Sequence, residues 1–331
     1  MEGAVTRRFA VVIGLAALLL AAMVVTGVAS GTIRLAPGAV LAALAGRGDP
    51  LTVTVVRELR LPRVALAALV GAGLAMSGTA LQATLRNPLA EPYLLGVSGG
   101  AAVGAVLAVV AGVAGAALLP LAAFVGAMAA VVVALLVARA AGGRADGRVL
   151  LMAGVIVGAF ANAAIMIVLA NAPADAIRNA TWWMMGSVGG AEWSGVRALA
   201  IYVAIGGGVL WANALDVDAL MLGDEPAAAL GVRVERTTRL VYLVSALLAA
   251  ATVSAAGLIG FVGLVVPHLA RATGLRTQRP LLAAAALIGA ALVVAADVVA
   301  RIAMPPAELP LGAVTALIGV PFFLTRLRAL R

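Results

Sequence analysis

The sequence predicts an all-α integral membrane protein with about ten transmembrane helices in one chain. Hydrophobic residues make up 64% of its 331 residues and charged residues only 11%, whereas soluble domains carry about 25% charged residues. A single core could not enclose so much apolar surface, so lipid must solvate most of it. A transmembrane barrel would need alternating strands and aromatic girdles, but aromatic residues are only 4% of the chain.

Apolar segments of spanning length, which is ~20 residues, recur along the whole chain. The first follows a short basic start, as in a signal peptide, but lacks a convincing cleavage site, so we expect it to remain as a helix. A later segment, 257–267, is short and rich in glycine, and we expect it to be a broken span shielded by protein or by a cavity. The full-length segments are 9–29, 62–84, 93–112, 115–138, 149–171, 195–213, 238–256, 281–302 and 311–327.

The distribution of arginine predicts the orientation. If the N-terminus is cytoplasmic, eight of the 23 arginines lie outside and the rest inside, as the positive-inside rule requires. Both termini then face the cytoplasm of a bacterial inner membrane. No soluble domain is apparent, since the longest polar loops are 30–61, 172–194 and 214–237. We therefore expect residues 1–331 to form a single transmembrane domain.

Residue types that are missing exclude several kinds of chemistry. All 23 basic residues are arginine, and a phosphate-binding P-loop or a Schiff base requires lysine. The chain has no cysteine and one histidine, His268, so sites built from several such ligands are excluded. We expect no enzymatic activity, no bound metal or cofactor and no nucleic-acid partner.

Basic residues cluster where the topology rule disfavours them. Arg57, Arg60 and Arg63 lie in RELRLPR, just before the second span on the outer face. They could extend to lipid headgroups or bind an acidic partner through bidentate pairs with carboxylates. Asp297 and Arg301 are four residues apart near the outer end of a span, so they can pair. That pair could be structural, and it could also place Arg301 beside the cluster.

Two cytoplasmic segments interrupt the apolar pattern. In the loop after the second span, Asn87-Pro88 and Glu91-Pro92 block helix continuation, which would suit a gate as well as an ordinary loop. In 257–280 the short span is expected to deliver Pro267 and His268 to the cytoplasmic side. For His268 a hydrogen-bonding role is favoured over a proton switch. The basic residues that follow could contact a soluble partner; they are Arg271, Arg276 and Arg279.

Two polar loops carry weaker signals. The stretch 215–236 carries Asp216, Asp218, Asp224 and Glu225, but their spacing fits no calcium loop, so an acidic loop helix is expected. Three tryptophans in 171–193 indicate an aromatic belt at the interface; a vestibule for a flat apolar ligand is the alternative.

Several motifs, taken together, resemble those of a known family. They are RLPR (60–63), SGTALQATLRNPLAEPYLLGVSGGAAVGA (77–105), LLMAGV (150–155), WWMMGSVGGAEW (182–193), LGDEPAAALGV (222–232), GLIGFVGLVVPHLAR (257–271), ADVVAR (296–301) and AELPLGAVTALIGVPFF (307–323). In this order, and over nearly the whole chain, the sequence resembles the FecCD/BtuC-type permeases of type II ABC importers. Those permeases move iron–siderophore complexes, haem or cobalamin.

The resemblance implies ten helices per subunit and a homodimer around a central path. It also implies two ATP-binding subunits on the cytoplasmic side, which bind the ATP and Mg, and a periplasmic substrate-binding protein outside. The overall sequence of these motifs resembles haem permeases more than cobalamin permeases. Haem is therefore the expected cargo, and an iron–siderophore complex or cobalamin is the alternative. An ion-coupled secondary transporter would usually carry ionisable residues in mid-span, and an intramembrane enzyme has few catalytic residues to draw on here.

The resemblance also carries residue roles onto matching positions. The docking arginines for the binding protein match Arg60, Arg63 and Arg301, with Arg57 beside them. The cytoplasmic gate matches Asn87 and Leu89 on one loop and Ala145 and Asp146 on a second. The coupling helices that contact the ATPase match roughly 266–279, including Pro267, His268 and Arg271.

Overall fold

The structure, a computed structural model, describes residues 2–31, 35–113, 117–142 and 147–328. Within these ranges the regular elements are helices, and one isolated bridge joins Met304 and Ala307. Seven of the described helices are long and apolar enough to cross a membrane. They are α1 (Glu2–Ala29), α3–η1–α4 as one rod (Pro50–Thr54, Val55–Arg60, Leu61–Thr84), α6 (Leu118–Ala140), α7 (Gly147–Ala170), α9 (Trp193–Ala212), α12 (Val234–Ala256) and α14 (Gln278–Ile302).

Three shorter apolar helices complete the set, namely α5 (Val97–Val110), α13 (Val262–Ala272) and α15 (Leu311–Arg328). Each of these helices falls on one of the predicted apolar segments, so the predicted all-α membrane fold is confirmed. The predicted polar loops also contain short helices that the sequence pattern did not delimit. These are α2 (Pro37–Leu44), α8 (Ala174–Met184), α10 (Ala214–Leu220) and α11 (Asp224–Ala229), and α3–η1 extends the second span back into the predicted loop 30–61. The short helix η2 (Pro92–Leu95) lies at the start of the predicted segment 93–112.

The predicted broken span at 257–267 is wrong in extent. Only 257–261 is non-helical, and α13 continues through the buried Pro267 to Ala272. A proline inside a helix leaves the carbonyl four residues earlier without its usual donor. Here the side chain of Gln82 donates to that carbonyl, of Gly263, at 3.3 Å. A polar side chain from another helix therefore allows α13 to pass its proline.

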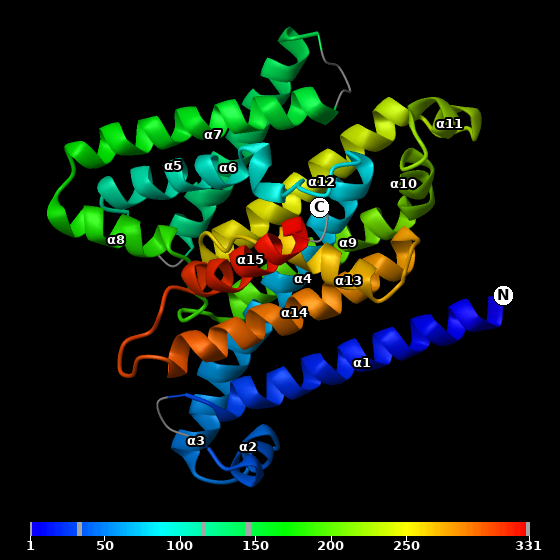
Figure 1. Cartoon of the computed structure of the whole chain (residues 1–331). Coiled ribbons are helices and arrows are strands. Elements are labelled where there is room, and N and C mark those ends of the chain that lie inside the picture. The colour runs from blue at the N-terminus through cyan, green and yellow to red at the C-terminus, as the bar shows by residue number, and fades with distance from the viewer. Residues whose placement is uncertain (1, 32–34, 114–116, 143–146, 329–331) are drawn as a thin grey trace.

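Helix α4 lies at the centre of the bundle (Figure 1). Its apolar window is 72% buried, compared with 67% for α12, 61% for α14 and 6% for α1. Helices α12, α13 and α14 pack around α4, while α5, α6, α7 and α8 form a layer on one side. On the opposite side α1 packs mainly along α14. Most of the surface of α1 is left for lipid or for another protein.

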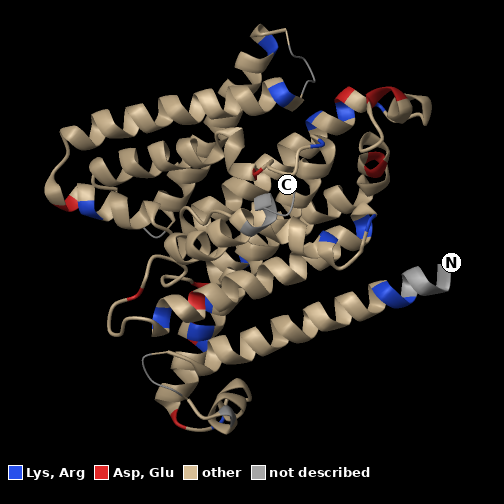
Figure 2. Ribbon diagram, viewed as in Figure 1, with Lys and Arg blue, Asp and Glu red and all other residues tan. Residues whose placement is uncertain are grey.

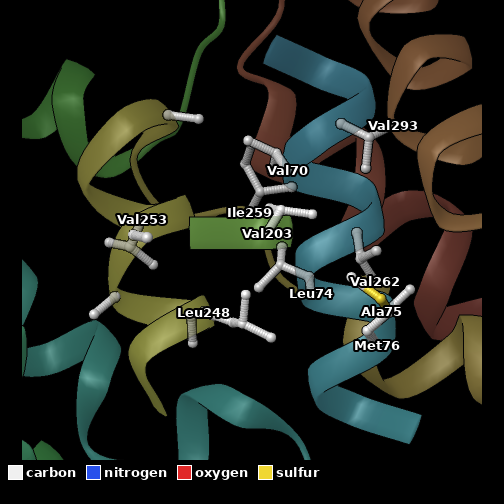
Figure 3. Packing of buried hydrophobic residues seen from close by; sticks show 14 of the residues in the cluster. Val70, Leu74, Ala75, Met76, Val203, Leu248, Val253, Ile259, Val262 and Val293 are labelled. Atoms are coloured by element: carbon white, nitrogen blue, oxygen red, sulfur yellow. The ribbon is translucent and has the colours of Figure 1, made fainter. Parts of the chain in front are cut away.

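Small residues allow the backbones of the central helices to approach closely. At Gly71 an added Cβ would collide with the carbonyl of Gly289 on α14, and at Gly78 with the carbonyl of Gly263 on α13. Around these contacts the core is filled by aliphatic side chains, among them Val70, Leu74 and Leu248 (Figure 3). Lipid tails are as apolar as these side chains, so close packing rather than water exclusion holds such helices together.

Charged residues gather at the two ends of the bundle, and the middle is nearly free of them (Figure 2). We define the arginine end by Arg60, Arg63 and Arg301, which lie where α1 and α14 end and α4 begins. We define the gate end by Asn87 and Leu89, in the loop that follows α4. The N-terminal end of α1 and the α10–α11 segment also lie at the gate end (Figure 1).

The glycine contacts give a direct test of this packing. Gly71→Ala should lower the free energy of unfolding of the purified protein by more than the roughly 1–3 kcal/mol that is typical of overpacking. The reason is that the new Cβ meets backbone, which cannot rotate away. The matched control is Gly158→Ala on α7, where a Cβ would meet nothing within 4 Å. It should be neutral or stabilising by up to about 1 kcal/mol. Equal melting temperatures for the two variants would contradict the packing described.

Candidate functional site

At the arginine end, two guanidinium groups cap the last carbonyls of α1. Nη1 of Arg60 donates to the carbonyls of Val28 and Ala29 at 2.8 and 3.0 Å. Arg301 donates to the carbonyls of residues 27 and 30 at 3.1 and 2.9 Å. These are the carbonyls that a helix end leaves without intrahelical partners, and positive charge is favoured there. Both arginines therefore fix the end of a helix that is otherwise little packed.

Arg63 lies between two carboxylates. Its Nε and Nη2 donate to Oδ1 of Asp297 at 3.0 and 2.8 Å, and Nη1 and Nη2 form a bidentate pair with Glu308 at 2.9 and 2.8 Å. Asp297, whose side chain is 1% exposed, also pairs with Arg301 at 3.0 Å. The sequence prediction that Asp297 and Arg301 pair is thus confirmed. Two carboxylates and the end of α1 offset three positive charges.

The bidentate pair involves the exposed member of the cluster. Glu308 lies in the loop between α14 and α15, and its side chain is 46% exposed. The hydrogen bond from Arg63 holds the pKa of the Glu308 carboxyl below its usual value. The pair is therefore complete at neutral pH and is lost only as the pH falls through that lowered pKa. Sequence reasoning did not single out Glu308; its position in the AELP stretch was the only signal.

The predicted docking arginines are brought together, but they face inward. Arg60 and Arg301 are 8% and 7% exposed, and Arg63 has donated four of its five N–H groups to the carboxylates. Arg57 is exposed but lies apart from the cluster, and it donates to the carbonyls of Ala43 and Leu44 at the end of α2. The structure therefore gives these arginines an internal role that the sequence did not predict.

At the gate end, the loop after α4 turns sharply. Arg86 has a positive φ of 49°, and the side-chain oxygen of Asn87 accepts from the backbone N–H of Leu89 at 2.9 Å. Leu89 is 51% exposed. The second predicted gate pair, Ala145 and Asp146, lies outside the described residues.

A polar cavity of about 740 Å³ opens beside this loop. An ion pair between Arg86 and Asp224, at 2.8 Å, lies on its wall and joins residues 85–90, which we name the gate loop, to α11. The start of α7 also lines the cavity, through Gly147 and Arg148. The cavity is thus bordered by the gate loop and by the residues that follow the second predicted gate pair.

The predicted coupling residues pack inside the bundle. Pro267 is buried in α13, and Arg271 donates to the side chain of Gln82 at 2.8 Å. Nδ1 of His268 lies 2.9 Å from the carbonyl of Leu264, and its ring meets Phe323 edge to face. The contact with Leu264 agrees with the hydrogen-bonding role favoured for this histidine, although it lies within a helix and not at a turn.

The pair of short helices α10 and α11 lies at the gate end (Figure 1). The acidic helix predicted for 215–236 is therefore two helices followed by the start of α12. Leu215, Leu222 and Leu230 are 61%, 66% and 67% exposed among these acidic residues. Apolar side chains exposed beside charges are typical of a surface that binds another protein.

The fold and the position of its charges define a class, the multi-span helical membrane proteins. Comparison with known proteins identifies the family: the FecCD transport family matches residues 18–329, and the chain belongs to it. The chain is 44% identical to a cobalamin import permease of Halobacterium salinarum, over 85% of this chain and 75% of that protein. It is 41% identical to a hemin permease of Yersinia pestis, over 81% of each protein. The chain is thus an ABC importer permease.

A solved structure supports the same assignment. A metal-chelate type ABC transporter in an inward-facing conformation superimposes with a TM-score of 0.84 at 29% identity, over 96% of this chain and 98% of the other. The fold of this chain is therefore that of a type II importer permease.

Replacing Asp297 tests whether the charge network at the arginine end stabilises the fold. Asp297→Asn would leave Glu308 as the one carboxylate beside Arg63 and Arg301 in this cluster, with the end of α1 as the remaining offset, and breaking a buried pair in this way costs about 3–5 kcal/mol. We expect a clear drop in melting temperature and earlier proteolysis after α1. Glu192→Gln, which removes an exposed carboxylate at the start of α9, should change neither. Wild-type stability of Asp297→Asn would show that the network contributes nothing.

Proposed function

We propose that this permease imports haem across a bacterial inner membrane, as a homodimer whose path lies between two copies of the chain. Two separate ATP-binding subunits supply the energy, and a periplasmic protein delivers the cargo. In this arrangement residues 1–331 act as one domain, the arginine end faces the periplasm, and both termini and the gate end face the cytoplasm. The observation that carries the proposal is family membership of a chain with no lysine, and hence no P-loop of its own.

The cargo is proposed from the relatives. A hemin permease is 41% identical and a cobalamin permease 44% identical, and both of these cargoes are metal-bearing macrocycles. Cobalamin is therefore one alternative, and because ferric citrate and achromobactin permeases are 35% and 39% identical, an iron–siderophore complex is the other. Because the single histidine contacts Leu264 and Phe323 inside the bundle, haem would pass without a relay of histidine ligands. The cargo would then make weak contacts along its path.

The ATP-binding subunits are proposed to bind the gate end. The exposed leucines of the α10–α11 segment offer an apolar contact there. Arg276 and Arg279, in the expected coupling segment and its continuation, are exposed at the turn into α14. The buried Pro267 and the inward-facing Arg271 would then transmit the motion of the ATPase through α13 and would not touch the ATPase directly.

Reconstitution in liposomes tests this function. The chain, its ATP-binding subunit and the binding protein should take up cargo only with ATP and Mg, and an uncoupler at constant ATP should have no effect. Uptake that continues without ATP, or that collapses with the uncoupler, would favour an ion-coupled transporter instead. Titrating the binding protein with haem, ferric siderophores and cobalamin tests the cargo, and clear siderophore selectivity would exclude haem.

Docking of the binding protein should depend on Arg63. Arg60 is unsuitable for this test, because its replacement would uncap α1. Arg63→Gln should weaken docking about tenfold and make it less salt-dependent, since one charge pair across the interface is lost. Glu308→Gln should strengthen docking, because Glu308 occupies the bidentate edge that a partner carboxylate would need. The control is Arg178→Gln, which replaces an exposed arginine of α8. Unchanged affinity in both test variants would show that the cluster serves only the fold.

A further inference from the structure

The break between α12 and α13 lies deep in the bundle. α13 has 11 residues, which is about half the length needed to cross the hydrocarbon core. Residues 257–261 therefore lie near mid-membrane, and Ile259 is 1% exposed. Backbone groups outside a helix at this depth must find partners within the protein.

Two side chains of one short segment supply these partners. The N–H of Ile259 donates to the hydroxyl of Tyr93 at 3.1 Å, and the N–H of Phe261 donates to the carboxylate of Glu91 at 2.9 Å. Glu91 also lies at the N-terminal end of α13, where a negative charge is favoured by the helix dipole. Both residues directly follow the gate loop that contains Asn87 and Leu89.

The backbone at the break is strained. Phe261 has a φ of 67°, a left-handed conformation that is uncommon for a bulky residue. Its Cβ lies against Gly319 of α15, where any side chain in place of the glycine hydrogen would collide with it. Such a conformation persists only where the surroundings impose it, and strain of this kind concentrates at switch regions.

A third side chain binds α13 from the other side of the gate loop. Gln82, in the last turn of α4, donates to the carbonyls of Gly263 and Leu264, both at 3.3 Å. It also accepts from Arg271 at 2.8 Å. Gln82, which precedes the gate loop, and Glu91, which follows it, thus both bond to the N-terminal part of α13. The two ends of the gate loop cannot move independently of that helix while these bonds hold.

We infer that Glu91 and Tyr93 are positioning residues that couple the cytoplasmic gate to α13. They hold the strained break in its present conformation, and with Gln82 they make α13 and the gate loop one moving part. A displacement of α13 by the ATPase then moves Asn87 and Leu89 with it. The inference rests on the proposed ATP-driven transport and adds to it the contact through which the gate responds.

The test measures uptake and ATP hydrolysis in the same proteoliposomes of the full transporter. Glu91→Ala combined with Tyr93→Phe should lower the cargo molecules taken up per ATP by about tenfold, within the usual range of coupling between sites. ATP hydrolysis should continue, because the ATPase is untouched. Glu91→Gln keeps an acceptor oxygen for Phe261 and should largely restore the ratio. The control combines Glu192→Ala with Tyr202→Phe, which removes the same groups from α9 and its N-cap.

A second measurement follows the gate directly. The chain contains no cysteine, so Leu89→Cys introduces one thiol into each copy of the chain, at an exposed gate position. Its reactivity with a water-soluble maleimide should change between nucleotide-free and ATP-bound transporter, and the Glu91→Ala/Tyr93→Phe background should abolish that change. If the double variant does not assemble, Tyr93→Phe alone is measured, since it removes one hydroxyl and should show a smaller loss of both responses.

The outcomes separate this inference from the proposed function. A wild-type ratio of uptake to ATP in the double variant, or a thiol response that persists there, would overturn the coupling role alone. Lack of ATP-dependent uptake by the unsubstituted transporter would overturn the proposed function and the inference with it. If the two residues only stabilise the fold, uptake and ATP hydrolysis should fall together, and the ratio of cargo taken up to ATP hydrolysed should stay unchanged.

Discussion

The need to satisfy every backbone polar group without water shapes this protein more than any other constraint. Regular helices meet it by themselves, so the informative places are those where a helix ends or breaks inside the bundle. At the end of α1, Arg60 and Arg301 donate to carbonyls 27–30. At the break before α13, Glu91 and Tyr93 accept from the backbone. Among the described residues, the charged side chains that are buried, Arg60, Asp297 and Arg301, all belong to the first of these sites.

The same solutions connect distant parts of the chain. A charged or amide side chain that hydrogen-bonds to the backbone of another helix also fixes the distance between the two helices. The glycines of α4 also bring its backbone into direct contact with the backbones of α13 and α14. The central helix is therefore closely packed against α13 and α14, while α1 packs mainly along α14 alone. A transport path in such a protein would change shape by moving joined groups of helices relative to one another.

The sequence predicted what depends on local composition. Apolar runs of spanning length gave the helices, because lipid makes length and hydropathy decisive. The pairing of Asp297 with Arg301 followed from helix periodicity. The inward direction of Arg60 and Arg63 could not be predicted, because their partners come from the end of α1 and from residues 297 and 308. The passage of α13 through Pro267 was missed for the same reason, since its compensating donor is 181 residues away.

The arginine end also bears on how the chain is made. Arg301 reaches carbonyls of α1 that precede it by 271 and 274 residues, and contacts between such distant segments form late in folding. Until α14 has been synthesised and inserted, the end of α1 lacks half of its donors and Arg63 has no Asp297 to pair with. Closure of the network is thus a signal, intrinsic to the molecule, that insertion has reached its final helices. A chain that lacks α14 would leave Arg63 without Asp297 and the end of α1 without the two donors that Arg301 supplies.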